Sequence, residues 1–351
     1  MNISINKYKW WLLLFVCVAL INACEKQPAS TQKPISFGDR KNITPIDGQN
    51  GLIWGYFGDT WVYGEKSGDD FIGKNAVVST VGSGSLTPSV TRYWVDTEDD
   101  YNFYSLYPYD GKTVTNAKLT KTNTDNTETV ALSFTYSDIT SQTDICVAGT
   151  PKESQYGKST PDAVHLNYTH VLSQLKFQAQ STIETMPIRL TKIELTNLVK
   201  GATFTITKLG EKQVDLNGDA EGGEVNCYTF TTIPAFLTEN NNIVTIGTDD
   251  EPYTINNIED NVATCIVIPE SNDNTNRPIH ITVTYDVLNP EDLDGAPIET
   301  NKTSDNYIPA CKWLSGTSYL YTLNITPSQP IVFGTVEVRD WENGGEEPVQ
   351  F

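Results

Sequence analysis

The sequence predicts an all-β protein built as two tandem β-sandwich domains, and three observations carry that prediction. Apolar and polar residues alternate with a period of two along several stretches, most clearly at 279–287 and 319–325. Clusters of Gly, Asn, Asp and Pro separate these stretches, as turns separate strands. No segment shows the apolar period of about 3.6 residues that marks an amphipathic helix. Many short strands with few helices are typical of β-sandwiches.

The chain begins with an export signal. Lys7 and Lys9 precede an apolar run at 10–21 that is too short to span a bilayer, and Cys24 follows it. A cysteine at this point is typical of a bacterial lipoprotein, whose thiol receives a lipid and becomes the new N-terminus. We therefore predict a lipoprotein signal peptide at 1–23, lipidation at Cys24 and attachment to a membrane outside the cytoplasm. An ordinary signal peptide with an incidental cysteine is the alternative.

The rest of the chain divides into a tether and two domains. Residues 24–33 are polar and form the predicted tether. The polar stretch 178–185, ahead of Pro187, is the predicted boundary between an N-terminal sandwich at 34–182 and a C-terminal sandwich at 183–351. Each would have about 150 residues, an ordinary size for one domain.

Several strands have more specific patterns. Residues 102–107 are apolar on both faces, which predicts a central, covered strand. Alternating apolar residues mark further strands at 132–136 and 164–168. At 331–338 the apolar parity changes at Gly334-Thr335, which predicts a β-bulge.

Charge excludes one class of partner. The chain has 24 basic and 44 acidic residues, for a net charge of −20. Because 1–23 contain two lysines and no acid, the remainder has 22 basic and 44 acidic residues, or −22. A chain this acidic repels the phosphate backbone of nucleic acids, so we expect no nucleic-acid partner.

The cysteines and histidines predict no metal site and no cofactor. None of Cys146, Cys227, Cys265 and Cys311 forms a Cys-x-x-Cys pair; buried free thiols are favoured, and disulfides remain open. The three histidines have separate places in the pattern. By strand parity, His165 and His280 face outward, whereas His170 points inward near a turn, where a hydrogen-bonded core histidine is the usual case.

No segment carries an enzyme motif. HExxH, GxSxG and phosphate-cradling glycine loops are absent, so no catalytic residue is predicted. Residues 215–220 begin like a calcium loop, but Ala220 replaces the required glycine and Asn226 the final glutamate, which favours an acidic turn. Four tryptophans are either core residues, the favoured interpretation, or a sugar-stacking platform: Trp54, Trp61, Trp94 and Trp313.

A set of short phrases spans most of the chain. In order, they are Ile35-Ser36-Phe37 with Arg40, Tyr93-Trp94 with 103–108, 143–148, 164–177, and the group of Gly316, Tyr319, Tyr321, 331–333 and Trp341. Together they resemble the fimbrillin (Mfa-like) family, the type V pilus subunits of gut and oral Gram-negative anaerobes. The resemblance covers residues 35–341 and implies two transthyretin-like β-sandwich domains in a lipoprotein of the outer membrane and the fimbrium.

The resemblance also implies a mode of assembly. In many such proteins an arginine-specific protease removes the first strand, and a strand from another pilin subunit fills the slot by donor-strand exchange. Here Ile35 and Phe37 would be the apolar residues of the removable strand, and Arg40-Lys41 the cleavage site. Lys33 and Lys26 are weaker candidates for cleavage. A solvated loop residue is the alternative for Arg40.

These inferences lead to two principal function classes. The first is a structural or accessory subunit of a pilus that serves adhesion to a host or bacterial surface ligand. Only ten residues follow Trp341, which favours a tip or anchor position. The second is an outer-membrane lipoprotein that binds glycans. A hydrolase whose two carboxylates meet only in space is a further alternative.

Overall fold

The computed structural model describes fourteen parts of the chain. They are residues 33–38, 48–57, 60–63, 76–82, 85–94, 100–124, 127–152, 154–183, 185–207, 228–232, 244–246, 253–254, 263–272 and 278–341. Within them the fold is all-β, as predicted, with one short 3-10 helix at Ile139–Ser141. No helix in these parts is long and apolar enough to cross a membrane. The signal peptide, Cys24, Arg40 and Lys41 lie outside the described residues.

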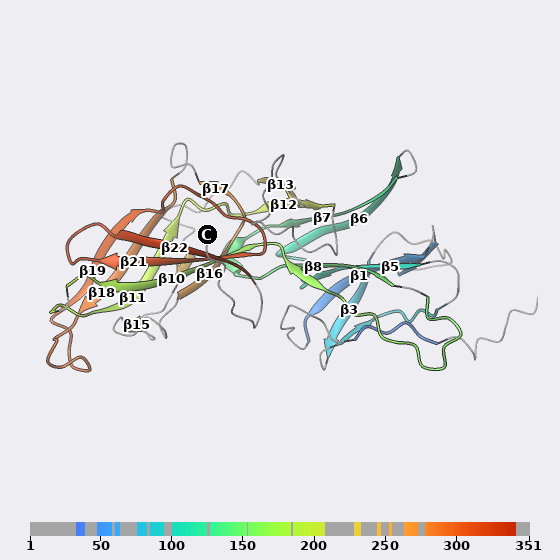
Figure 1. Cartoon of the computed structure of the whole chain (residues 1–351), viewed down its shortest axis with the longest axis horizontal. Coiled ribbons are helices and arrows are strands. Elements are labelled where there is room, and N and C mark those ends of the chain that lie inside the picture. Colours follow the sequence, from blue (N-terminus) through green and yellow to red (C-terminus); the bar gives the residue numbers. More distant parts are fainter. Residues whose placement is uncertain are drawn as a thin grey trace, which may run out of the picture.

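The molecule is elongated, with separate groups of strands at its two ends (Figure 1). One end holds a sheet in the order β4-β3-β1-β5-β8-β9, with β2 also paired to β1. Its strands are β1 (Asn50–Phe57), β2 (Thr60–Tyr63), β3 (Val77–Gly82), β4 (Ser85–Pro88), β5 (Tyr101–Tyr107), β8 (Cys146–Lys152) and β9 (Tyr168–His170). Strand β5 pairs with β1 on one side and β8 on the other, which confirms the predicted central strand.

A second sheet, β13-β12-β7-β6, lies beside the first. Its strands are β6 (Val114–Thr124), β7 (Thr127–Tyr136), β12 (Ala202–Ile206) and β13 (Tyr228–Thr232). The rings of Phe134 and Phe204 stack with centroids 5.2 Å apart on neighbouring strands. Both belong to the same apolar core as Leu52 and Trp54 of β1, so the two sheets share a core.

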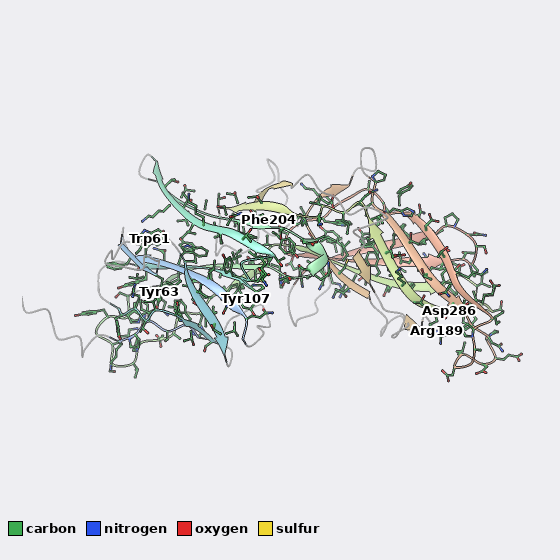
Figure 2. The ribbon with its side chains drawn as sticks, turned by 180° about the vertical axis from the view of Figure 1, so that it is seen from behind. Trp61, Tyr63, Tyr107, Arg189, Phe204 and Asp286 are labelled. Atoms are coloured by element: carbon green, nitrogen blue, oxygen red, sulfur yellow. The ribbon has the colours of Figure 1, made fainter. Side chains whose placement is uncertain are left out.

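The other end of the molecule contains two four-membered strand paths and a short pair (Figure 1). The first path is β16 (Ala263–Val267), β10 (Ser173–Ser181), β21 (Thr317–Ile325) and β22 (Val332–Asp340). The second is β14 (Val244–Ile246), β11 (Ile188–Thr196), β18 (His280–Val287) and β19 (Glu299–Tyr307), with β15 (Tyr253–Thr254) also paired to β11. The short pair is β17 (Ser271–Asn272) with β20 (Cys311–Lys312). An ion pair between Arg189 and Asp286, 3.3 Å long, links β11 to β18 (Figure 2).

Two of these sheets combine strands from both sides of the predicted boundary at 182/183. Strand β7 pairs with β12, and β10 pairs with both β16 and β21. The polar stretch at 178–185 therefore does not separate one set of sheets from another. The division into tandem sandwiches at this point stays a prediction.

The strand patterns predicted from the sequence match the burial. Ile281, Val283, Tyr285 and Val287 of β18 are buried, whereas Thr282 and Thr284 between them are partly exposed. In β22, Val336 pairs with Tyr321 and Phe333 with Leu323, so two residues of β22 stand opposite Thr322. The extra residue falls at Gly334-Thr335, which confirms the predicted bulge.

A close approach between β1 and β5 leads to a prediction about Gly55. A Cβ on Gly55 would lie 2.7 Å from Cδ1 of Phe103, a ring that is fully buried. Gly55→Ala should therefore lower the free energy of unfolding by about 1–3 kcal/mol. The matched control is Gly82→Ala, where a Cβ meets nothing within 4 Å. Urea denaturation of both variants checks this, and equal stabilities would contradict it.

Asp110 organises the turn that leads into β6. Its carboxylate accepts hydrogen bonds from the backbone amides of Lys112, Thr113 and Val114, with N–O distances of 2.9–3.0 Å to Oδ1. Burial acts to raise the pKa of Asp110, but the amide donors together outweigh it and lower the pKa to about 2. The charged form is therefore favoured in the folded protein.

This shift predicts a pH dependence of stability. Because the folded pKa of Asp110 lies below its ordinary value of 3.8, its contribution is complete above pH 4 or so and is lost as the pH falls towards 2. Solvent screening of this exposed group limits the contribution to about 0.5–1 kcal/mol. Asp110→Asn should show a smaller loss of stability over that range, measured by denaturation at each pH.

Candidate functional site

Residues 33–38 lie between two other segments of the chain. On one side, the amide of Ile35 donates to the carbonyl of Arg92 (2.8 Å), and the amide of Trp94 donates to the carbonyl of Lys33 (3.1 Å). On the other side, the amide of Gly38 donates to the carbonyl of Val164 (3.1 Å), whose own amide donates to Ser36 (2.8 Å). We call residues 33–38 the inserted segment. Its backbone is paired on both edges.

The two apolar side chains of the inserted segment are buried. Ile35 is 4% exposed and Phe37 is 3% exposed. The Phe37 ring meets Phe103 and Tyr63 edge-on, with centroid distances of 5.4 and 5.5 Å. The Tyr63 hydroxyl donates to the carbonyl of Ile35 (3.3 Å), and burial raises the pKa of Tyr63 to about 12, so it stays a donor at physiological pH.

The inserted segment closes a core of its own. Strand β1 contributes Ile53 to this core and Leu52 and Trp54 to the larger one, so the two cores lie on opposite faces of the sheet. Figure 2 shows Trp61 and Tyr63 of β2, which belong one to each core. Other members of this core include Tyr63, Val77, Leu86, Trp94, Tyr101, Phe103, Val164 and Leu166. Without residues 33–38, this face would lose its Ile35 and Phe37 side chains.

The sequence indicated only part of this arrangement. The resemblance of Ile35-Ser36-Phe37 to the fimbrillin family marked the segment, but nothing in it identified the two flanking segments that it pairs with. Val164 was predicted as a strand residue, whereas it forms an isolated parallel bridge to Phe37. Cleavage at Arg40-Lys41 is untested by the geometry, because both residues lie outside the described parts.

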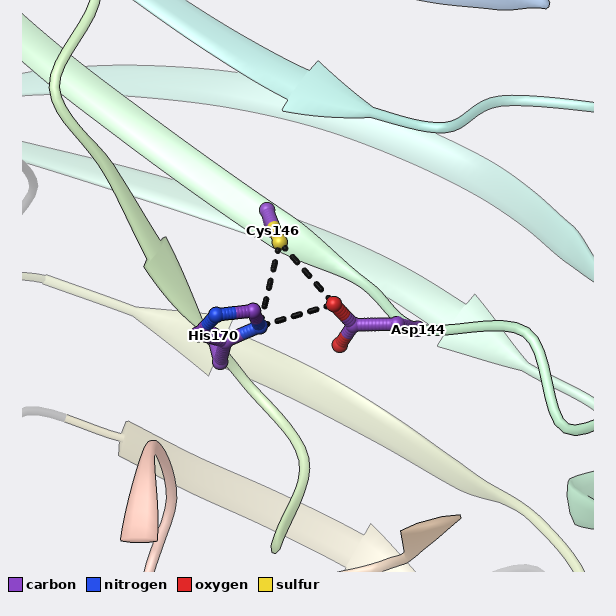
Figure 3. Close-up of side chains that lie close together, drawn as sticks. All are labelled: Asp144, Cys146 and His170. Atoms are coloured by element: carbon purple, nitrogen blue, oxygen red, sulfur yellow. Dashed lines mark hydrogen bonds and ion pairs between the residues drawn. The ribbon is translucent and has the colours of Figure 1, made fainter. Parts of the chain in front are cut away.

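A group of titratable side chains meets where β8 pairs with β9 (Figure 3). Nδ1 of His170 lies 2.7 Å from Oδ2 of Asp144, and Sγ of Cys146 lies 3.4 Å from the same oxygen. Sγ and Nδ1 are 3.5 Å apart. Burial, and next the charge of Asp144, raise the pKa of the Cys146 thiol well above its usual value. We call these three residues the Asp–Cys–His cluster.

Sequence reasoning placed His170 inward, which its 3% exposure confirms, but did not bring these three residues together. The available signal was that 143–148 and 164–177 were both recognisable phrases. Direct pairing of Cys146 with His170 across two strands is a tertiary fact that neither phrase contains.

Other predicted residues have structural roles. Trp54, Trp61, Trp94 and Trp313 are all at most 6% exposed, which confirms the core interpretation and rules them out as a sugar-stacking platform. Cys146 and Cys265 are buried free thiols, as favoured. Cys227, the side chain of Cys311 and residues 215–220 lie outside what the structure describes. His165 is exposed as predicted; His280 is less so, and its Nε2 bonds to Asp305 at 2.9 Å.

Comparison with known proteins identifies the family of the chain. The model of the fimbrillin-like family matches residues 58–341. The chain belongs to this family. No curated protein matches the sequence.

Three solved structures are among those similar to this fimbrillin-like protein. A proposed cell adhesion protein from Bacteroides uniformis is 16% identical and has a TM-score of 0.50. The match covers 90% of this chain and 100% of that one. A proposed cell adhesion protein from Bacteroides ovatus is 15% identical, with a TM-score of 0.49 and coverage of 90% and 99%. A fimbrial protein from Bacteroides vulgatus is 14% identical, with a TM-score of 0.46 and coverage of 88% and 100%.

Proposed function

We propose that this fimbrillin-like protein is a subunit of a pilus, exported as a lipoprotein through Cys24 and assembled by strand exchange to serve adhesion. It would be anchored in the outer membrane before assembly and belong to the fimbrium afterwards. The inserted segment is the observation that carries the proposal. It is distant in sequence from Arg92 and Trp94 on one side and from Val164 on the other, yet it pairs with both sides. Its Ile35 and Phe37 side chains are buried.

The physical basis of exchange is the state of the slot once the segment leaves. The carbonyl of Arg92 and the amides of Trp94 and Val164 would lose their backbone partners. Unpaired strand edges are templates for another strand, and an incoming strand restores the bonds and fills the apolar positions. Burial of each large apolar side chain contributes about 1.5–3 kcal/mol, so occupation of the slot is favoured over vacancy.

The pairing of the inserted segment supports one of the three candidate positions for the cut. Lys33 itself accepts a hydrogen bond from Trp94, and a cut after Lys33 or Lys26 would leave Ile35 and Phe37 in place. A cut after Arg40 would separate the whole inserted segment, whose described residues end at Gly38, from the rest of the chain. Cleavage at Arg40-Lys41 is therefore the cut that we propose.

Mass spectrometry of the mature N-terminus, on cells that produce the protein natively, tests this proposal. We expect a lipid-modified Cys24 on the uncut form and a free Lys41 at the start of the form in fibres. An uncut form that starts at a residue other than Cys24, or at a Cys24 without lipid, would contradict the lipoprotein. Fibres whose subunits still contain Ile35 and Phe37 would contradict the exchange.

A further inference from the structure

We propose that the Asp–Cys–His cluster binds one borderline divalent cation of the Zn²⁺ type. The three residues supply a carboxylate, a thiolate and an imidazole, which are the ligand types that zinc sites use. Their ligand atoms all lie within 4.8 Å of one another. The backbone hydrogen bonds of the inserted segment involve none of these three residues, although Cys146 belongs to the same apolar core as Ile35 and Phe37.

The distances within the cluster are close to those of a zinc site. With metal–ligand bonds of about 2.0–2.3 Å, tetrahedral ligand atoms stand roughly 3.3–3.8 Å apart. The Sγ–Oδ2 and Sγ–Nδ1 distances are 3.4 and 3.5 Å, and only the Nδ1–Oδ2 distance, 2.7 Å, is shorter. Two edges of the coordination triangle are thus already in place. Binding of an ion would require the third edge to lengthen.

A second observation marks the cluster as a place for a positive charge. Oδ1 of Asp144 is buried, and none of the described residues donates a hydrogen bond to it. A buried carboxylate oxygen without a partner is unfavourable by about 1–3 kcal/mol. A cation bound by both oxygens of the Asp144 carboxylate would satisfy Oδ1 as well as Oδ2. The charges of one carboxylate and one thiolate would balance a divalent ion.

The residues around the cluster hold Cys146 and His170 in place and leave the cluster partly exposed to solvent beside Asp144. Cys146 and His170 are fixed opposite each other by the pairing of β8 with β9. The Trp341 ring stacks on His170, with centroids 4.0 Å apart and planes at 7°, and covers the imidazole. The side chain of Asp144 is 28% exposed, against 2% for His170, so an ion and a solvent ligand would enter beside Asp144. A bound ion would cross-link the loop before β8, β8 itself and β9.

Titration of the purified full-length protein with Co²⁺, under reducing conditions after chelator treatment and dialysis, tests the site. Co²⁺ reports thiolate ligation through a charge-transfer absorption. We expect one Co²⁺ per chain with that absorption, displaced by one Zn²⁺. Cys146→Ser should abolish the absorption, and Cys265→Ser, which removes the other buried free thiol, should retain it.

Asp144→Asn keeps the side-chain shape and removes the charge, and should weaken binding at least about 100-fold, the upper range for loss of a supporting residue. Zn²⁺ should raise the unfolding temperature of the wild type and Cys265→Ser but not of Cys146→Ser. If the wild-type protein shows no such absorption, the metal site is wrong and the three residues form a hydrogen-bonded cluster only. Absorption that survives in folded Cys146→Ser, or unchanged affinity in Asp144→Asn, overturns the site as well.

Discussion

Replacing Arg40 with alanine is expected to abolish polymer formation while the protein still reaches the cell surface. The inserted segment would then stay joined to the rest of the chain, and its four backbone hydrogen bonds would keep the slot filled. Because the filled slot presents no free edge, a strand from another subunit cannot enter it. The expected product is a lipidated monomer. Denaturing gels without boiling should show a ladder for the wild type and a single band for Arg40→Ala.

Two control variants make this experiment specific. Arg339→Ala removes a partly exposed arginine of β22 that pairs with Glu337, and it should polymerise normally. Arg40→Lys keeps the charge, so an arginine-specific protease would leave it uncut and monomeric as well. Normal ladders from Arg40→Ala would remove Arg40 from the mechanism. Loss of ladders in Arg339→Ala as well would point to a general effect of lost charge.

The sequence predicted best those features that depend on a single strand. Period-two alternation at 279–287 and the change of parity at Gly334-Thr335 both correspond to observed burial and pairing. These features are local, because successive side chains of a strand point to opposite faces whatever the strand pairs with.

Features that depend on pairing between distant strands were beyond the sequence. Strand β10 forms a parallel pair with β21, whose residues lie 144 positions further on at Gln178 and Thr322. No turn connects such strands, so no local pattern records their register. The Asp–Cys–His cluster was missed for the same reason, since it exists only because β8 and β9 are neighbours.

Phe37→Ala is expected to have the largest effect on the stability of the uncut protein, lowering its free energy of unfolding by about 3–5 kcal/mol. The ring is 3% exposed and packs against Phe103 and Tyr63, which cannot close the cavity without moving a strand of the sheet. Val78→Ala is the matched control, because Val78 of β3 is 43% exposed and its loss should matter by less than about 0.5 kcal/mol. Urea denaturation of the full-length protein measures both.

Phe37→Ala also distinguishes a strand that is removed during assembly from one that stays in the assembled subunit. If the inserted segment leaves during assembly, subunits in the fibre no longer contain residue 37, and fibres from Phe37→Ala should dissociate at the same temperature as wild-type fibres. The weaker segment should also leave its slot sooner after cleavage, so ladders should appear earlier in a time course. If Phe37→Ala weakened the fibre as much as the uncut protein, the segment would remain in the assembled subunit. Strand exchange at this slot would then be wrong.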